Sequence, residues 1–138
     1  MRAMIRYIVV SIGSGILFGV MDGLINANPI AQRLYRVFEP IAKKSINVPA
    51  GVVIDLVYGF AMAGIFLLLH ASLPGESGVL KGLSFGLLAW FFRVAMGVAT
   101  QWMTFNVPVP ALLYTLGCGL VEMLVLGLLY GLTLNPSI

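Results

Sequence analysis

The chain has 138 residues, of which 60% are hydrophobic and only 9% are charged. Soluble domains carry about a quarter of charged residues, so this composition argues against a soluble globular domain. Intrinsic disorder is excluded as well, because it requires low hydrophobicity. The formal net charge of +3 does not indicate nucleic-acid binding, since the basic residues fall at the ends of apolar segments. The composition therefore predicts a multi-pass integral membrane protein, whose host membrane and orientation stay open.

Four apolar segments are each long enough to cross a membrane as a helix, which takes about 20 residues. They run over about 7–25, 48–69, 79–102 and 109–133. Pro29, Pro49 and Pro110 suit the first turn of a helix, where no backbone N–H is needed. We therefore predict an all-α fold, in which residues 1–138 form one transmembrane domain built as a four-helix bundle.

The first segment follows Arg2 and Arg6, as a signal peptide would, but its apolar run is long and no small-residue cleavage site follows. We expect a retained first helix. Both chain ends and the loop around Glu76 then lie on one side of the membrane, which we name side A. The connection 26–47 and the turn 104–108 lie on the opposite side, side B. Basic residues are spread over both sides, so the positive-inside rule does not decide the orientation.

The connection between the first two segments carries a helical pattern of its own. Asn28 can cap a helix that begins at Pro29. Apolar residues then recur near the helical period, which predicts a short amphipathic helix over about 29–39 in the membrane interface, bent or ended by Pro40. A solvated basic loop is the alternative. The basic side chains that would face anionic lipid are Arg33, Arg36, Lys43 and Lys44.

Small residues recur at helical spacing in all the apolar segments. They are Ser11, Gly15, Gly19 and Gly23 in the first, Gly51, Gly59 and Ala63 in the second, Gly82 and Gly86 in the third, and Gly119, Gly127 and Gly131 in the fourth. Helices associate in lipid through close packing, which small residues permit. These faces predict tight contacts, either within the bundle or between subunits.

Charged residues also lie inside the apolar segments: Asp22, Asp55, Arg93 and Glu122. Such a group costs about 2.5–3.5 kcal/mol at a helix centre, so it faces the bundle interior or serves a function. At about 1.5 Å per residue, Asp22 and Asp55 lie about 5–9 Å from side B, and Glu122 lies near the middle. We predict a cluster of Asp55, Arg93 and Glu122, with Asp22 nearer the side-B rim.

Two interpretations of this cluster stay open. In the structural one, Arg93 bridges one or two acids and fixes the helices together, because a guanidinium binds carboxylates in a bidentate manner and keeps its proton. In the functional one, the excess of acid over base leaves a carboxyl group that binds and releases a proton or cation. The neighbours of Arg93 along its helix, Gly97 and Thr100 among them, are small or polar, so we expect that face to point inward.

Other polar residues carry weaker signals. Asn26, Gln101 and Asn106 fall on side B, where they form either a polar vestibule or caps and turns. The single cysteine, Cys118, and the single histidine, His70, supply no disulfide, no CxxC site and no bis-histidine haem site within the chain. We therefore expect no metal and no cofactor. Motifs of soluble enzymes are absent, so we expect no catalytic residues, although acid-based chemistry on lipid stays open.

These features predict a non-enzymatic membrane protein that assembles through its small-residue faces. It would be a homo-oligomer or a small subunit of a larger membrane complex, with the lipid bilayer and membrane subunits as its partners. The alternative is an oligomeric proton- or cation-coupled transporter or channel for a small solute, using Glu122 and Asp55. Carboxyl groups that serve transport should be open to water on one side, whereas structural ones should be enclosed and matched to Arg93.

Overall fold

The computed structural model describes residues 2–43 and 45–134, and these residues form helices and connections with no strand among them. In chain order the elements are α1 (Arg2–Ala27), α2 (Pro29–Leu34), the 3₁₀ helix η1 (Tyr35–Ile41), α3 (Val48–Leu69), the 3₁₀ turn η2 (His70–Ser72), α4 (Gly78–Trp90), the π-helical turn η3 (Phe91–Ala95), α5 (Met96–Thr104) and α6 (Val109–Thr133). Four helical stretches are long and apolar enough to cross a membrane. The predicted all-α fold with four long apolar helices is thus confirmed.

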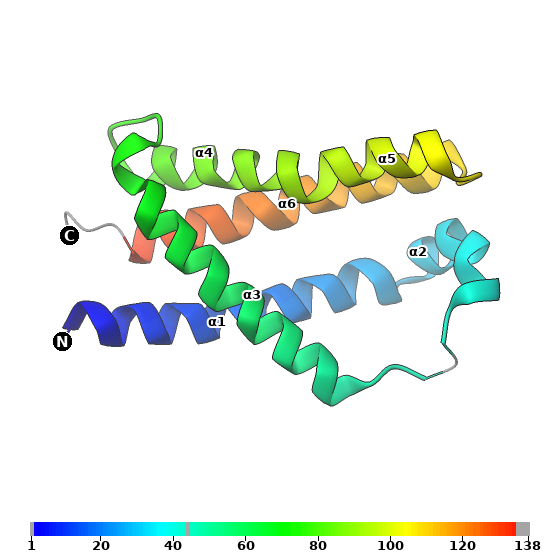
Figure 1. Cartoon of the computed structure of the whole chain (residues 1–138), viewed down its shortest axis with the longest axis horizontal. Helices are drawn as coiled ribbons and strands as arrows, with labels where there is room; N and C mark the ends of the chain where they lie inside the picture. Colours follow the sequence, from blue (N-terminus) through cyan, green and yellow to red (C-terminus); the bar gives the residue numbers. More distant parts are fainter. Residues whose placement is uncertain (1, 44, 135–138) are drawn as a thin grey trace.

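The connections gather at the two ends of the molecule. Figure 1 shows the start of α1 and the end of α6 at one end, together with the connection between α3 and α4. The opposite end holds α2, η1 and the turn between α5 and α6. This arrangement matches the predicted division into side A and side B, and we keep these names for the two ends of the molecule.

Local hydrogen bonds set where the helices begin and end. Asn28, Asn47 and Ser77 cap α2, α3 and α4, each accepting a bond from the backbone N–H three residues on, at 2.9, 3.1 and 3.1 Å. Such caps satisfy backbone donors that the first turn of a helix leaves unpaired. Beyond the end of α3, the Lys81 ammonium group donates to the carbonyl oxygen of His70 at 2.8 Å. Residues near the helix ends therefore fasten the side-A connection to α4.

Helices α4 and α6 pack backbone against backbone through glycines. Figure 1 shows the two helices running alongside each other. A Cβ atom on Gly82 would collide with the carbonyl oxygen of Gly127, and a Cβ on Gly127 with that of Gly82. A Cβ on Gly86 would lie 2.6 Å from the carbonyl oxygen of Met123. No side chain larger than hydrogen fits at these positions without separating the helices.

Helices α1 and α3 cross obliquely in Figure 1 and approach closely in the same manner. A Cβ on Gly15 would lie 2.8 Å from the carbonyl oxygen of Asp55, and one on Gly59 would collide with that of Ser11. By contrast, Gly23 and Gly51 have nothing within 4 Å of an added Cβ. Much of the predicted small-residue surface is thus used between helices of the same chain.

The buried interior has two parts. Towards side A, Phe66 of α3, Phe85 of α4 and Tyr130 of α6 meet, with ring centroids 5.4–6.1 Å apart. Towards side B, Val94 and Val98 pack on Leu112. Because α1 also packs against α6, it joins the α1–α3 pair to the α4–α6 pair along the middle of the molecule.

The side-B connection is helical from Pro29 to Ile41, but only α2 is α-helical and the remainder is the 3₁₀ helix η1. Pro40 lies inside η1, which ends one residue later. Asn28 donates to the hydroxyl of Tyr114 in α6 at 2.8 Å, and that hydroxyl donates to the carbonyl oxygen of Ile25 at 2.5 Å. These bonds hold the connection against the first turns of α6.

Candidate functional site

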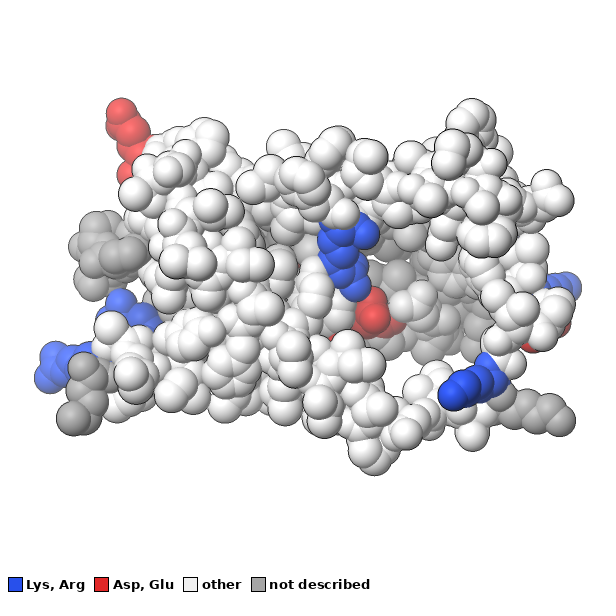
Figure 2. Space-filling model, in the orientation of Figure 1, with Lys and Arg blue, Asp and Glu red and all other residues white. Residues whose placement is uncertain are grey.

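A cluster of four charged side chains lies between the long helices, and each of the four apolar stretches contributes one of them. Asp22 comes from α1, Asp55 from α3, Arg93 from η3 and Glu122 from α6. Figure 2 shows basic and acidic atoms meeting beside a hollow midway along one face, where the surrounding atoms are uncharged. The other charged side chains visible on this face lie towards the two ends.

Arg93 and Glu122 form the ion pair of the cluster, in which Glu122 is enclosed and Arg93 is partly exposed. Arg93 Nη1 lies 3.7 Å from Glu122 Oε1, and the exposed fractions of the two side chains are 34% and 2%. The guanidinium carbon also lies 4.7 Å from the ring centroid of Phe18 and 5.0 Å from that of Tyr58. These rings stack on each other with centroids 4.5 Å apart. One carboxylate and two aromatic rings therefore hold the positive charge of Arg93.

Asp22 belongs to the cluster. Its carboxyl group lies within electrostatic range of those of Glu122 and Asp55. That Asp22 lies nearer the side-B rim stays a prediction, and α1, which carries it, packs against both α3 and α6. Three carboxyl groups, from α1, α3 and α6, therefore lie within electrostatic range of one another.

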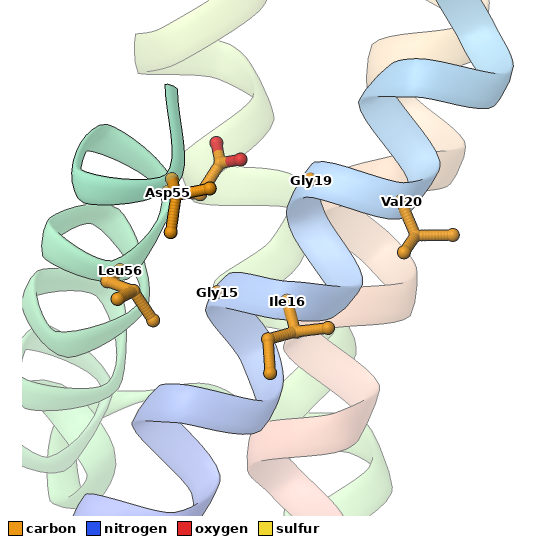
Figure 3. A pocket seen from close by; sticks show the side chains of 7 residues that line it. Gly15, Ile16, Gly19, Val20, Asp55 and Leu56 are labelled. Atoms are coloured by element: carbon orange, nitrogen blue, oxygen red, sulfur yellow. The ribbon is translucent and has the colours of Figure 1, made fainter. Parts of the chain in front are cut away.

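Asp55 is half-buried and lies over the backbone of α1. A Cβ on Gly19 would lie 2.6 Å from Asp55 Oδ2, so a larger residue there would displace the carboxylate. Figure 3 shows the Asp55 side chain directed from α3 towards α1. A pocket of about 290 Å³ surrounds it, lined by Gly15, Ile16, Gly19, Val20, Val52, Asp55 and Leu56. Among the described residues, no basic side chain lies within 4.0 Å of Asp55 or Asp22.

Arg93 lies within a π-helical turn, and this turn changes the face that the following residues present. A π turn contains more residues than an α turn, so the helical register shifts beyond it. We expected Gly97 and Thr100 to point inward with Arg93. That expectation is wrong, because both residues are exposed and Val98 is buried in their place. No proline marks the π turn, so the sequence carries no local signal for it.

The predicted polar vestibule does not appear as a connected group. Asn26 donates to the carbonyl oxygen of Asp22 at 2.8 Å, within its own helix. Asn106 is exposed and Gln101 is half-buried, and no hydrogen bond between described residues joins them to each other or to Asn26. These side chains therefore act separately, and Asn26 supports the end of α1.

The remaining candidates lie apart from the cluster. Arg33, Arg36 and Lys43 are exposed on the side-B connection, and Lys44 lies outside the described residues. The Nε2 atom of His70 is buried at side A and has no hydrogen-bond partner among the described residues. In the part of the chain that is described, no group of three or more His, Cys, Asp and Glu residues is arranged to hold a metal ion.

Sequence reasoning missed the contribution of Phe18 to the cluster. Phe18 lies four residues before Asp22 on α1, and Tyr58 lies three residues after Asp55 on α3. Residues at these spacings share a helix face, so the spacing was a usable signal.

Comparisons with known protein families, with curated proteins and with solved structures find no match.

Proposed function

We propose that this chain is a multi-pass integral membrane protein that binds and releases protons at Asp22, Asp55 and Glu122, as a proton-coupled transporter or channel for a small solute. The observation that carries the proposal is the charge imbalance within the cluster. A single guanidinium faces three carboxyl groups, and its contact within 4.0 Å is with Glu122.

Two carboxylates side by side in an apolar interior repel each other strongly, because little solvent screens their charges. The cluster holds more carboxyl groups than Arg93 can offset, which supports the uptake of a proton or cation there. Arg93 offsets the charge that remains on Glu122 and keeps this residue in place. The outer acid, Asp55, is half-buried beside an open pocket, which supports exchange of a proton with the surroundings.

The outer surface of the helices supports placement in a membrane. Large apolar side chains are exposed along α1, α3 and α6, including Val9, Ile54 and Val121 at 61–63%. Hydrocarbon is the environment in which such a surface is stable. Helices α2 and η1 then lie in the side-B interface, where the exposed Arg33, Arg36 and Lys43 contact anionic headgroups.

Proton movement in proteoliposomes tests this function. We expect purified protein, reconstituted with a pH-sensitive dye inside the vesicles, to dissipate an imposed pH gradient. Asp55→Asn and Asp22→Asn should each abolish this activity, because an amide does not bind a proton at these pH values. Glu76→Gln is the matched control, since this acid is exposed on the side-A connection. Equal activity of Asp55→Asn and the control would contradict the proposal, and dependence on Na⁺ in place of pH would replace the proton by a cation.

Assembly into a larger complex is a second candidate, and the outward-facing glycines favour it. An added Cβ would meet nothing within 4 Å at Gly13, Gly23, Gly97 or Gly117. Small residues on a lipid-facing surface allow another helix to approach closely. Native mass spectrometry of the gently extracted protein tests this candidate. A homo-oligomer agrees with a transporter, foreign subunits identify an accessory subunit, and a monomer contradicts assembly.

A further inference from the structure

A groove separates α3 from α4, from the middle of the molecule towards side A. Figure 1 shows the two helices diverging from the side-A connection that joins them, and they hardly touch along their lengths. The groove has a volume of about 400 Å³, within the range of about 300–1,000 Å³ that is typical of small-molecule sites. Its walls are mostly apolar side chains of both helices, among them Met62, Ile65, Leu88 and Phe92.

Arg93 is the charged side chain among the described residues that line this groove, and it is 34% exposed. Its distance of 3.7 Å to Glu122 Oε1 is longer than a hydrogen bond. None of the side-chain hydrogen bonds between described residues involves the guanidinium, as those of its neighbours Trp90 and Thr100 illustrate. A guanidinium carries five N–H donors in a planar fork that matches a carboxylate. The exposed part of this fork is therefore available to an acceptor in the groove.

The acids of the cluster do not face the groove. Glu122 is only 2% exposed, and Asp55 lines the separate pocket between α1 and α3. Neither these two residues nor Asp22 belongs to the described lining of the groove. A ligand in the groove thus meets a positive charge, although the cluster as a whole holds more acid than base.

We propose that the groove binds a small carboxylate with an apolar body, as the solute of the proposed transporter, so that the inference rests on the proposed function. The carboxylate of the solute binds Arg93, and its apolar body lies between α3 and α4 towards side A. The apolar walls and the single exposed cation match these two parts of the ligand.

The depth of Arg93 argues against a bilayer phospholipid as the occupant. Arg93 lies about 16 Å from the side-B end of its helical stretch, Gly78–Thr104, and about 22 Å from the side-A end, at about 1.5 Å per residue. The hydrocarbon core of a bilayer is about 30 Å thick, so the guanidinium lies near its middle and far from the headgroups. A free carboxylate reaches this depth, whereas a phospholipid headgroup stays in the interface.

Charge balance couples the solute to a proton. The solute enters as the neutral carboxylic acid, because a carboxylate is costly to place in hydrocarbon. Once ionised, it competes with Glu122 for the guanidinium. An enclosed Glu122 without its cation is costly as an anion, so it takes up the proton that the solute releases. One O–H bond breaks in the solute and one forms on Glu122, the total charge is unchanged, and each solute brings one proton.

Photolabelling tests the site. The full chain, in nanodiscs of a zwitterionic phospholipid, is illuminated with a decanoic acid that carries a diazirine on its chain, and labelled residues are mapped by mass spectrometry. We expect label on groove residues of both helices, Ile65 and Leu88 among them. Unlabelled decanoate should displace it at least about tenfold better than decanol or decylamine, which have the same chain without the negative charge.

Two charge variants should act in opposite directions. Arg93→Gln should weaken competition by decanoate about tenfold or more, the scale of a charge-assisted hydrogen bond. Glu122→Gln should strengthen it, because the guanidinium then has no competing carboxylate. Ile65→Trp fills the groove, keeps every charged residue and should remove the label, so the site stays testable if Arg93→Gln does not fold. Leu68→Trp, at a position 85% exposed on the same helix, is the matched control.

The outcomes separate the solute site from the proposed function. Equal displacement by decanol and decanoate, label outside the groove, or equal loss of label in Leu68→Trp and Ile65→Trp overturns the site. If the site fails while Asp55→Asn still abolishes proton movement, the proposed function stands. If decanoate occupies the groove but Asp55→Asn moves protons as Glu76→Gln does, the function and the coupling are overturned and the binding site stands.

Discussion

At the scale of single residues, Arg93 illustrates how one charge is tolerated between apolar helices. Its guanidinium lies 3.7 Å from a glutamate that is almost fully enclosed, and the stacked rings of Phe18 and Tyr58 cover part of its remaining surface. Removing one member of an ion pair whose other member is buried leaves that buried charge without a partner. The resulting loss of folding free energy is larger than the contribution of the intact pair. The cluster therefore depends on Arg93 whether or not protons move through it.

We predict that Arg93→Gln lowers the free energy of unfolding by about 2–4 kcal/mol, because Glu122 is then left enclosed without its cation. Thermal unfolding in detergent measures the effect. The added substitution Glu122→Gln should restore part of the loss, which identifies the interaction between the two residues. Arg33→Gln, on the exposed side-B connection, is the control and should change stability by less than about 0.5 kcal/mol. Equal stability of the Arg93 and Arg33 variants would refute this account.

At the scale of helices, glycine decides which pairs approach closely. The contacts between α4 and α6 are made by backbone atoms, which do not move aside as flexible side chains do. The same glycines lower the intrinsic preference for helix, and close packing offsets that effect. Glycines in one helix thus divide into those that face a partner and those that face outward.

Helix α6 offers a matched pair of substitutions. Gly127→Ala would place a Cβ 2.9 Å from the Cα of Gly86 and against the Gly82 backbone, so we expect a loss of about 1–3 kcal/mol. Gly117→Ala meets nothing within 4 Å and should be neutral or slightly stabilising. The resistance of each variant to unfolding in detergent provides the measurement. A Gly117 variant as unstable as the Gly127 variant would show that the outer face is also packed, in an oligomer.

The attachment of α2 to α6 is also decided at the scale of helices. Asn28→Ala removes both the helix cap and the bond to Tyr114, whereas Asn47→Ala removes the cap of α3 without such a cross-link. Loss of a cap costs about 1 kcal/mol. We therefore expect faster amide hydrogen exchange over 29–41 in the Asn28 variant, and little change there in the Asn47 variant. Unchanged exchange in both variants would mean that other contacts hold the connection.

At the scale of the whole molecule, the start of α1, the end of α6 and the connection 73–77 lie at one end, and the turn 105–108 lies at the other. Four membrane crossings, as proposed, would place these two ends in opposite compartments. Cysteines introduced in a Cys118→Ser background test this arrangement. Glu76→Cys and Asn106→Cys should react with an impermeant thiol reagent from opposite sides of sealed vesicles, and Arg36→Cys should react from the same side as Asn106→Cys. Labelling of positions 76 and 106 from one side would contradict four crossings.

Composition and hydrophobic periodicity already determine the helices of this protein. Apolar runs of about 20 residues, separated by prolines and turn residues, leave the backbone few ways to satisfy its hydrogen bonds other than helix. The spacing of Gly15, Gly59, Gly82 and Gly127 likewise indicates close helix contacts. Each of these signals is local, since it depends on residues within a few turns of one another.

Only the tertiary structure decides what meets across the bundle. Asp22 comes within electrostatic range of Glu122 because α1 packs against α6, and no local pattern specifies that pairing. The π turn at Arg93 redirects the face of α5, and the bond between Tyr35 and Thr115 joins residues 80 positions apart. The sequence by itself determined which charged residues lie within apolar helices, because the length and composition of each apolar segment identify them. Their neighbours depend on how the helices pack, which is a property of all the contacts together.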